Sequence, residues 1–204
     1  MLNFLTSTLY HISNSLLIPV ILTILGMLVW TALLLGGFLR EWFERRKLSP
    51  LLAAAVAAAR ERRDADATWS LVAAAPYGLP ARFARFVAQG SGDAKIMEQG
   101  LTVVENDVAS SVARHSFITR VAPILGLMGT LIPLGPALSG LANGNMQALS
   151  GNLIVAFTAT VVGLLISGVA YGMGLARRTW YASDLSSLEF IVDAITEREG
   201  ARHA

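Results

Sequence analysis

The segment VAPILGLMGT, Val121 to Thr130, combines glycines, a proline and a hydroxyl in an otherwise apolar run. It opens a stretch, residues 121–176, that contains no charged side chain, and residues 1–39 form a second such stretch. All 16 Lys and Arg and all 14 Asp and Glu lie in residues 40–120 or after residue 176. This separation is typical of a membrane protein, because charge is costly in the hydrocarbon core.

The uncharged stretches contain three segments that are long enough to cross a membrane as helices. Residues 15–39 exceed the roughly 20 residues that span a ~30 Å hydrocarbon core. The second stretch is too long for one crossing, and the Asn and Gly residues in 143–152 predict a turn. We therefore predict an all-α integral membrane protein with transmembrane helices at 15–39, 121–142 and 153–176.

The positive charges predict how these helices are oriented. Neither the N-terminal residues 1–14 nor the turn at 143–152 contains Lys or Arg. The other helix ends are flanked by Arg40, Arg45, Arg46, Lys47, Arg114, Arg120, Arg177 and Arg178. By the positive-inside rule, the N-terminus and the turn lie outside, and residues 40–120 and 177–204 lie in the cytoplasm. Aromatic residues fall near the expected interfaces, as is usual in membrane proteins: Tyr10, Trp42, Trp180 and Tyr181.

The segment between the first two transmembrane helices is predicted to be helical with breaks. Ser49 and Pro50 match a helix N-cap followed by proline at the first helical position, and an alanine-rich run follows them. The sequences APYGLP (75–80) and QGSGD (89–93) predict breaks. From Asp93 the apolar residues recur at helical spacing without interruption into the second transmembrane helix.

Beyond the third transmembrane helix, apolar residues recur at steps of three and four: Tyr181, Leu185, Leu188, Val192 and Ile195. Such a seam packs against another helix. The second and third transmembrane helices are therefore expected to extend into a cytoplasmic helical bundle. A bundle that packs on itself and a surface that docks a partner both fit this spacing.

Small residues recur at three- and four-residue steps along the second and third transmembrane helices. In lipid no hydrophobic effect drives helices together, so close packing of small residues takes its place. The residues predicted to line a pore or to pack closely are Gly126, Gly129, Pro133, Ala156, Gly163 and Ser167. Three prolines in the second helix would each free a backbone carbonyl, which in a membrane requires a partner from protein or from a wet cavity.

Two threonines, Thr130 and Thr160, also lie in these helices. Taken alone, each is best explained by a bond back to a carbonyl one turn earlier. No predicted transmembrane helix contains Asp, Glu, Lys, Arg or His. Proton pumps and channels usually use such a group, so any titrating group must come from another chain. His115, outside the predicted spans, is interpreted as an interfacial residue, with a proton relay as the alternative.

Two motifs resemble those of a known family. VAPILGLMGTL, residues 121–131, resembles the second-helix motif of the MotA/TolQ/ExbB proton-channel family. AFTATVVGLL, residues 156–165, resembles its third-helix motif. The predicted topology also agrees, and three membrane helices rather than four favour the TolQ/ExbB branch over MotA.

The resemblance implies a pentameric ring in a prokaryotic inner membrane, whose second and third helices line a pore. It implies two copies of a small single-span partner of the ExbD, TolR or MotB kind, which supply a titrating aspartate. It places Thr130 and Thr160 on the family's threonines, which face that aspartate and support ion passage. One departure is Val155, since TolQ and ExbB proteins usually have a glutamate there.

The sequence thus predicts a channel or stator subunit of an ion-driven motor of TolQ/ExbB type, with H⁺ or Na⁺ as the ion. The alternative is a non-conducting membrane scaffold that keeps the same fold, and Val155 is its best support. No enzymatic activity, cofactor, metal or nucleic-acid partner is expected, because no nucleophile–base pair or metal-ligand spacing is recognisable.

Overall fold

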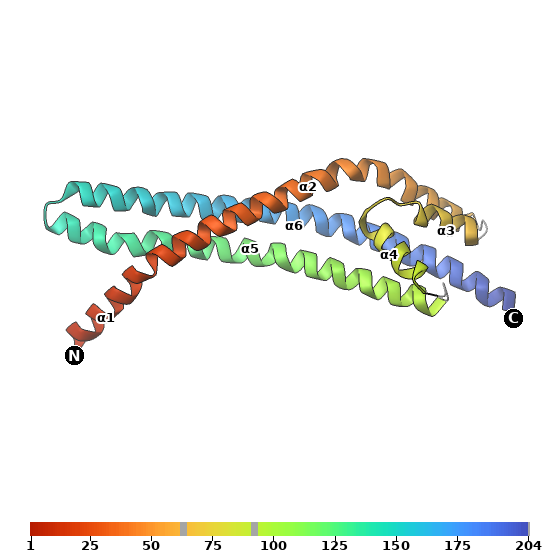
Figure 1. Cartoon of the computed structure of the whole chain (residues 1–204), viewed down its shortest axis with the longest axis horizontal. Coiled ribbons are helices and arrows are strands. Elements are labelled where there is room, and N and C mark those ends of the chain that lie inside the picture. Colours follow the sequence, from red (N-terminus) through yellow and green to blue (C-terminus); the bar gives the residue numbers. More distant parts are fainter. Residues whose placement is uncertain (62–64, 91–93, 204) are drawn as a thin grey trace. The chain divides into compact units, whose positions relative to one another are not determined.

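The structure is a computed structural model that describes residues 1–61, 65–90 and 94–203. Within these ranges the chain is all helix and turn, with no strand (Figure 1). The helices are α1 (Leu2–Ser15), α2 (Leu17–Arg60), α3 (Ala65–Ala73), α4 (Gly78–Ala88), α5 (Ala94–Ala142) and α6 (Met146–His203). Three helical stretches are long and apolar enough to cross a membrane: Phe4–Arg45, Lys95–Ala142 and Met146–Arg198. The predicted all-α, multi-pass membrane fold is confirmed.

Helix α2 corrects the helix start that we predicted at Ser49. The helix runs through Pro50 to Arg60 without interruption. A proline inside a helix removes one backbone hydrogen bond and is normally unfavourable. Here Leu48 and Leu52, on either side of it, are both buried in apolar clusters. These contacts and the alanine-rich run hold the helix together where the local signal alone favoured a new start.

The turn between α5 and α6 is shorter than the predicted 143–152, because α6 already begins at Met146. Gly144 has a positive φ of 70°, a conformation that glycine adopts without steric strain. The Asn145 side-chain oxygen accepts a hydrogen bond of 2.9 Å from the backbone N–H of Ala148. Asn145 is therefore an N-cap, and the residues after it continue as helix.

The other predicted breaks are found where the structure describes them. The break at 75–80 is realised between α3 and α4, and α4 itself begins at Gly78. Helix α4 ends at Ala88, just before the predicted break at 89–93. Residues 91–93 of that break lie outside the described residues.

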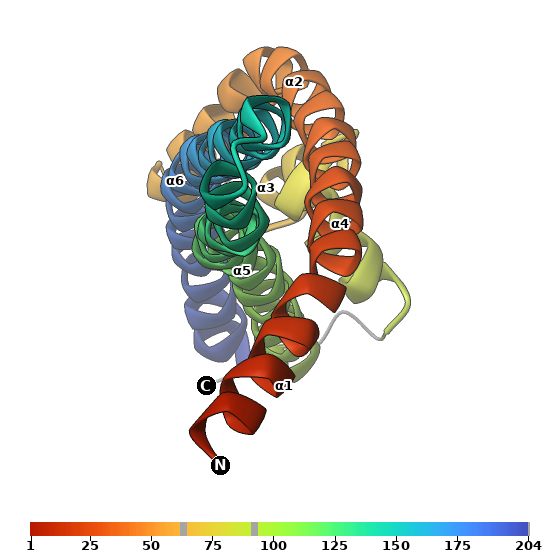
Figure 2. The ribbon, with the colours of Figure 1, turned by 90° about the vertical axis from the view of Figure 1, so that its left-hand side faces the viewer.

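The chain forms two compact units, and α2, α5 and α6 contribute to both. Residues 1–36 and 114–174 form the first, called here the membrane unit. Residues 37–113 and 175–204 form the second, called here the bundle unit. In the membrane unit, α5 and α6 run side by side and are joined by the short turn (Figures 1 and 2).

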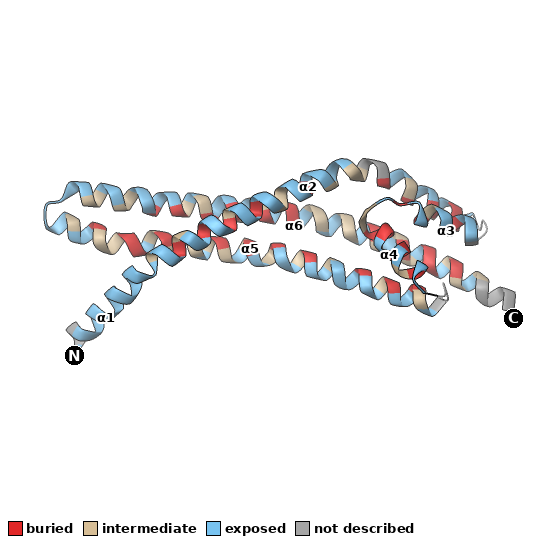
Figure 3. Ribbon diagram, viewed as in Figure 1, coloured by how far each residue is buried: buried red, intermediate tan, exposed pale blue. Residues whose placement is uncertain are grey.

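The membrane unit has a thin core and an apolar exterior. Its buried side chains come from all three long helices: Val20, Ile24, Met27, Ile118, Ala122, Ile132, Ala159, Ile166 and Ala170. Large apolar side chains such as Leu22, Ile124 and Phe157 face outward and are 58–66% exposed. Figure 3 shows the resulting pattern, in which exposed residues dominate these helices. Such a surface is suited to contact with lipid or with another apolar chain.

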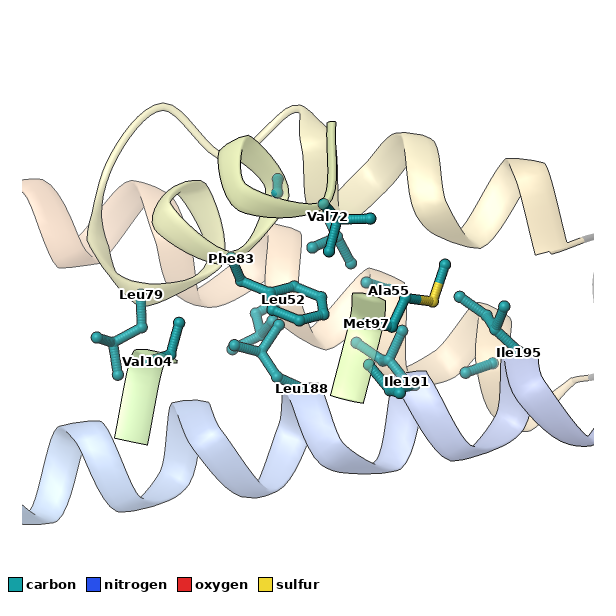
Figure 4. Close-up of a cluster of buried hydrophobic side chains, with 14 residues drawn as sticks. Leu52, Ala55, Val72, Leu79, Phe83, Met97, Val104, Leu188, Ile191 and Ile195 are labelled. Atoms are coloured by element: carbon teal, nitrogen blue, oxygen red, sulfur yellow. The ribbon is translucent and has the colours of Figure 1, made fainter. Parts of the chain in front are cut away.

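The bundle unit has a larger core built around Phe83, which is fully buried. Figure 4 shows this ring among side chains from α2, α5 and α6. The predicted seam after residue 176 packs here: Leu188, Val192 and Ile195 are buried in this core, and Tyr181 and Leu185 pack against it. The packing of the bundle on itself therefore accounts for the seam without a docked partner.

The burial of Phe83 predicts a large loss of stability on truncation. Phe83→Ala removes a fully buried ring and should lower the free energy of unfolding by about 3–5 kcal/mol. Phe190→Ala is a matched control, because Phe190 is 41% exposed and should lose much less. Thermal melting of the purified protein in detergent, followed by circular dichroism, tests this. Equal shifts of Tm in the two variants would contradict the assigned core.

Candidate functional site

In the membrane unit, α5 and α6 approach most closely where glycine faces glycine. A Cβ atom added to Gly163 would lie 2.7 Å from the Ala122 carbonyl oxygen and 3.0 Å from the Gly126 Cα. A Cβ added to Gly126 would lie 3.3 Å from the Ala159 carbonyl oxygen. Since the obstacles are backbone atoms, only a separation of the two helices could relieve the contact at Gly163. The structure thus places Gly126 and Gly163 in one helix–helix contact.

Three further predicted residues lie on the packed side of these helices. A Cβ on Gly129 would lie 2.6 Å from the Ala159 Cβ, so this glycine also faces α6. Pro133 is almost fully buried, and Ala156 is 3% exposed. All three therefore contribute to packing within a single chain.

A hydroxyl from α6 satisfies a carbonyl that proline leaves free in α5. Pro123 has no N–H, so the carbonyl of Thr119, one turn earlier, loses its helical partner. The Ser167 hydroxyl donates to that carbonyl oxygen at 2.8 Å. The proline in the second helix is thus tolerated because the third helix supplies the missing donor.

Thr160 lies two helical turns before Ser167 and also reaches across to α5. Its hydroxyl donates to the Gly126 carbonyl oxygen at 3.3 Å. The interpretation that Thr160 bonds back to its own helix is therefore wrong for this structure. O–H···O hydrogen bonds are usually 2.7–2.8 Å long, so the Thr160 contact is weak beside that of Ser167.

The other threonines make local bonds. Thr130, half-buried, donates to the Leu127 carbonyl oxygen at 2.7 Å. Thr158, exposed, donates to the Ile154 carbonyl oxygen at 2.8 Å. The local interpretation therefore holds for Thr130, whereas Thr160 differs from both.

Sequence reasoning missed two buried polar residues of the membrane unit. His115, interpreted as interfacial, is only 2% exposed. It packs against α6, where a Cβ added to Gly174 would lie 3.1 Å from the Cβ of His115. Thr31 in α2 is 3% exposed, and its hydroxyl oxygen is buried without a hydrogen-bond partner in the described structure. Neither residue stands in a motif, so only the fold could reveal its burial. Over the described ranges, no three His, Asp or Glu side chains gather where they could hold a metal ion.

The fold and this contact define a multi-pass membrane protein whose second and third spanning helices pack through glycines and hydroxyls. The model of the MotA/TolQ/ExbB proton channel family matches residues 87–180, a range that contains the glycine contact between α5 and α6. The resemblance stated from the two helix motifs is confirmed over this range. No curated protein and no solved structure matches the chain.

The glycine contact predicts that one added methyl group separates the helices. Gly163→Ala should destabilise the protein by about 1–3 kcal/mol, the usual effect of overpacking. Gly168→Ala, in the same helix, has nothing within 4 Å and should be neutral or slightly stabilising, because alanine favours helix. Thermal melting of both variants in detergent measures the difference. A Gly163→Ala protein as stable as Gly168→Ala would contradict the close contact.

The partnership of Ser167 with Pro123 predicts a coupled pair of substitutions. Ser167→Ala should cost about 1–3 kcal/mol, because it leaves the Thr119 carbonyl without this donor in an apolar setting. In a Pro123→Ala background the restored N–H satisfies that carbonyl, so Ser167→Ala should cost much less. Unfolding measurements on the four proteins of this cycle test the coupling. An equal cost in both backgrounds would show that Ser167 acts elsewhere.

Proposed function

We propose that the protein is the ring-forming subunit of an ion-driven membrane motor of TolQ/ExbB type, with the proton as its ion. Five copies would surround two copies of a small single-span partner. The observation that carries this proposal is a proton-channel family match over a helix pair whose apolar stretch, residues 121–176, contains no Asp, Glu, Lys, Arg or His. Proton transfer through lipid needs such a group, so the partner would supply it as an aspartate.

Thr160 is the residue that we assign to the ion pathway with most support. Its hydroxyl can both donate and accept, and its 3.3 Å bond to Gly126 is easily exchanged. Thr130 would serve the same pathway, although here it is bonded within α5. Both hydroxyls would assist proton exchange with the partner's aspartate through water. Gly126, Gly129, Pro133, Ala156, Gly163 and Ser167 would hold the pore-forming helices in place.

The proposed cycle is conformational, and the protein would not be an enzyme. Each charge that crosses the membrane releases about 2.3 kcal/mol per 100 mV. Protonation and release of the partner's aspartate would use this energy to step the ring around the partner. The distribution of Lys and Arg supports an orientation with the N-terminus outside and the bundle unit in the cytoplasm. The family match supports a location in a prokaryotic inner membrane.

The proposal predicts that the Thr160 hydroxyl is required for coupling. Thr160→Val keeps the shape of the side chain but removes the hydroxyl, so ion-coupled work should be lost while the complex still assembles. Thr160→Ser should restore activity, and Thr158→Val, which alters an exposed local bond, should leave it unchanged. Proton flux into vesicles that contain the whole complex measures these effects. Full flux in Thr160→Val would overturn the pathway.

A second candidate is a non-conducting scaffold, which the apolar Val155 favours. Val155 is 38% exposed, and the usual family glutamate would stand there. A scaffold would show no proton flux in any variant, including the wild type, although its ring would assemble. The same vesicle assay therefore separates the two functions, with native mass spectrometry of the extracted complex as the check on assembly.

A further inference from the structure

A groove of about 1010 Å³ runs along the bundle unit between α2 and α6. One wall is the apolar face of α2, which includes Leu48 and Leu52. The other wall is a row of hydroxyls on α6, from Thr179, Ser183 and Ser187. The spacing of these three residues places them on one face of the helix.

The groove contains an ion pair between Arg45 and Asp184, and one oxygen of the Asp184 carboxylate accepts no hydrogen bond in the described structure. Arg45 donates from Nη2 to the Asp184 Oδ1 at 2.6 Å, and its guanidinium lies 5.0 Å from the centre of the Trp180 ring. Asp184 is 5% exposed, and its second oxygen, Oδ2, is buried and has no hydrogen-bond partner among the residues that the structure describes. A buried carboxylate oxygen without a donor is destabilising, so this site is improved by any ligand that brings an N–H donor.

The ion pair lies close, along α2, to the end of the uncharged stretch. The uncharged part of α2 ends at Leu39, and Arg45 follows less than two helical turns later. Counted along the helix, this is about 9 Å beyond the uncharged stretch, just outside a headgroup layer of about 5–7 Å, and the long Arg45 side chain can bridge that gap. Trp42 and Trp180 line the groove beside the pair, where indole rings favour the membrane interface.

We infer that this groove binds a phospholipid whose headgroup carries both a phosphate and a primary ammonium. The phosphate accepts hydrogen bonds from the free N–H groups of Arg45, and the ammonium donates to Asp184. The last side-chain torsion of aspartate is soft, so a small rotation turns Oδ2 toward the groove. The negative phosphate of the headgroup thereby pairs with Arg45, and the positive ammonium pairs with Asp184.

The ammonium sets the specificity of the site. A choline headgroup has the phosphate and a positive charge, but it has no N–H to donate to Asp184. A glycerol headgroup has the phosphate but no cation. An ethanolamine headgroup satisfies both members of the pair. This inference depends only on the bundle unit and on the membrane character of the chain, and it holds whether or not the protein conducts ions.

The test is lipid competition on the full-length complex. The complex is reconstituted into bilayers with equal parts of ethanolamine, choline and glycerol phospholipids, extracted gently, and analysed for bound lipid by native mass spectrometry. The ethanolamine lipid should be enriched about tenfold over each competitor, the factor that one charge-assisted hydrogen bond of ~1.4 kcal/mol supplies. Binding in proportion to the bulk mixture would overturn the inference.

Two matched variants locate the bound lipid. Ser183→Phe fills the groove from an exposed position and should abolish the enrichment, whereas Ser186→Phe, exposed on α6 but outside the groove, should keep it. Equal enrichment in both would place the lipid elsewhere and overturn the assignment. Asp184→Asn should shift the preference to the anionic glycerol lipid, because Arg45 then has no counter-charge.

A polypeptide in the groove is the competing occupant. The chain has no cysteine, so Ser183→Cys creates a unique site for cross-linking in the membrane. Efficient cross-linking to another copy or to another protein would show that a chain fills the groove, and would overturn lipid binding. The inference requires that this cysteine is not cross-linked to protein.

Discussion

The contact of Gly163 with Gly126 determines how near the two central membrane helices lie. In lipid the apolar side chains gain nothing by leaving one apolar surface for another, so backbone proximity and hydrogen bonds between helices hold the pair. Because the backbones almost touch there, hydroxyls on α6 are within reach of carbonyls on α5. The bonds of Thr160 and Ser167 therefore depend on the absence of two Cβ atoms.

The same constraint explains why prolines can stand in a membrane helix. The carbonyl that Pro123 leaves free would be costly if it were buried without a donor, but the Ser167 hydroxyl donates to it in a bond of normal length. The longer bond of Thr160 is made to the Gly126 carbonyl, which already accepts a hydrogen bond within its own helix. The fold therefore does not require the Thr160 bond. Two hydroxyls on one helix face thus make different contacts: Ser167 bonds a carbonyl that lacks its helical partner, and Thr160 adds a longer bond to a carbonyl that has one.

The sequence predicted what depends on composition and local pattern. Segregated charge indicated the three spanning segments, and the two motifs led to the family whose model matches residues 87–180. The prediction failed where distant contacts outweigh a local signal, as at Pro50, which Leu48 and Leu52 hold inside a helix. It also missed partners that are far apart in the chain. Nothing local to Asp184 indicates that Arg45 will face it, and nothing local to His115 predicts its burial.

The short turn at Gly144 and Asn145 has a consequence for biogenesis. With so few residues between them, α5 and α6 cannot separate far or exchange partners with a neighbouring copy, so their contact is made within one chain. The parts of both arms nearest the turn, within residues 121–176, are uncharged, and the turn between them is short. The helix pair can therefore enter the membrane as a preassembled unit, with its hydroxyl–carbonyl bonds formed before any other subunit arrives.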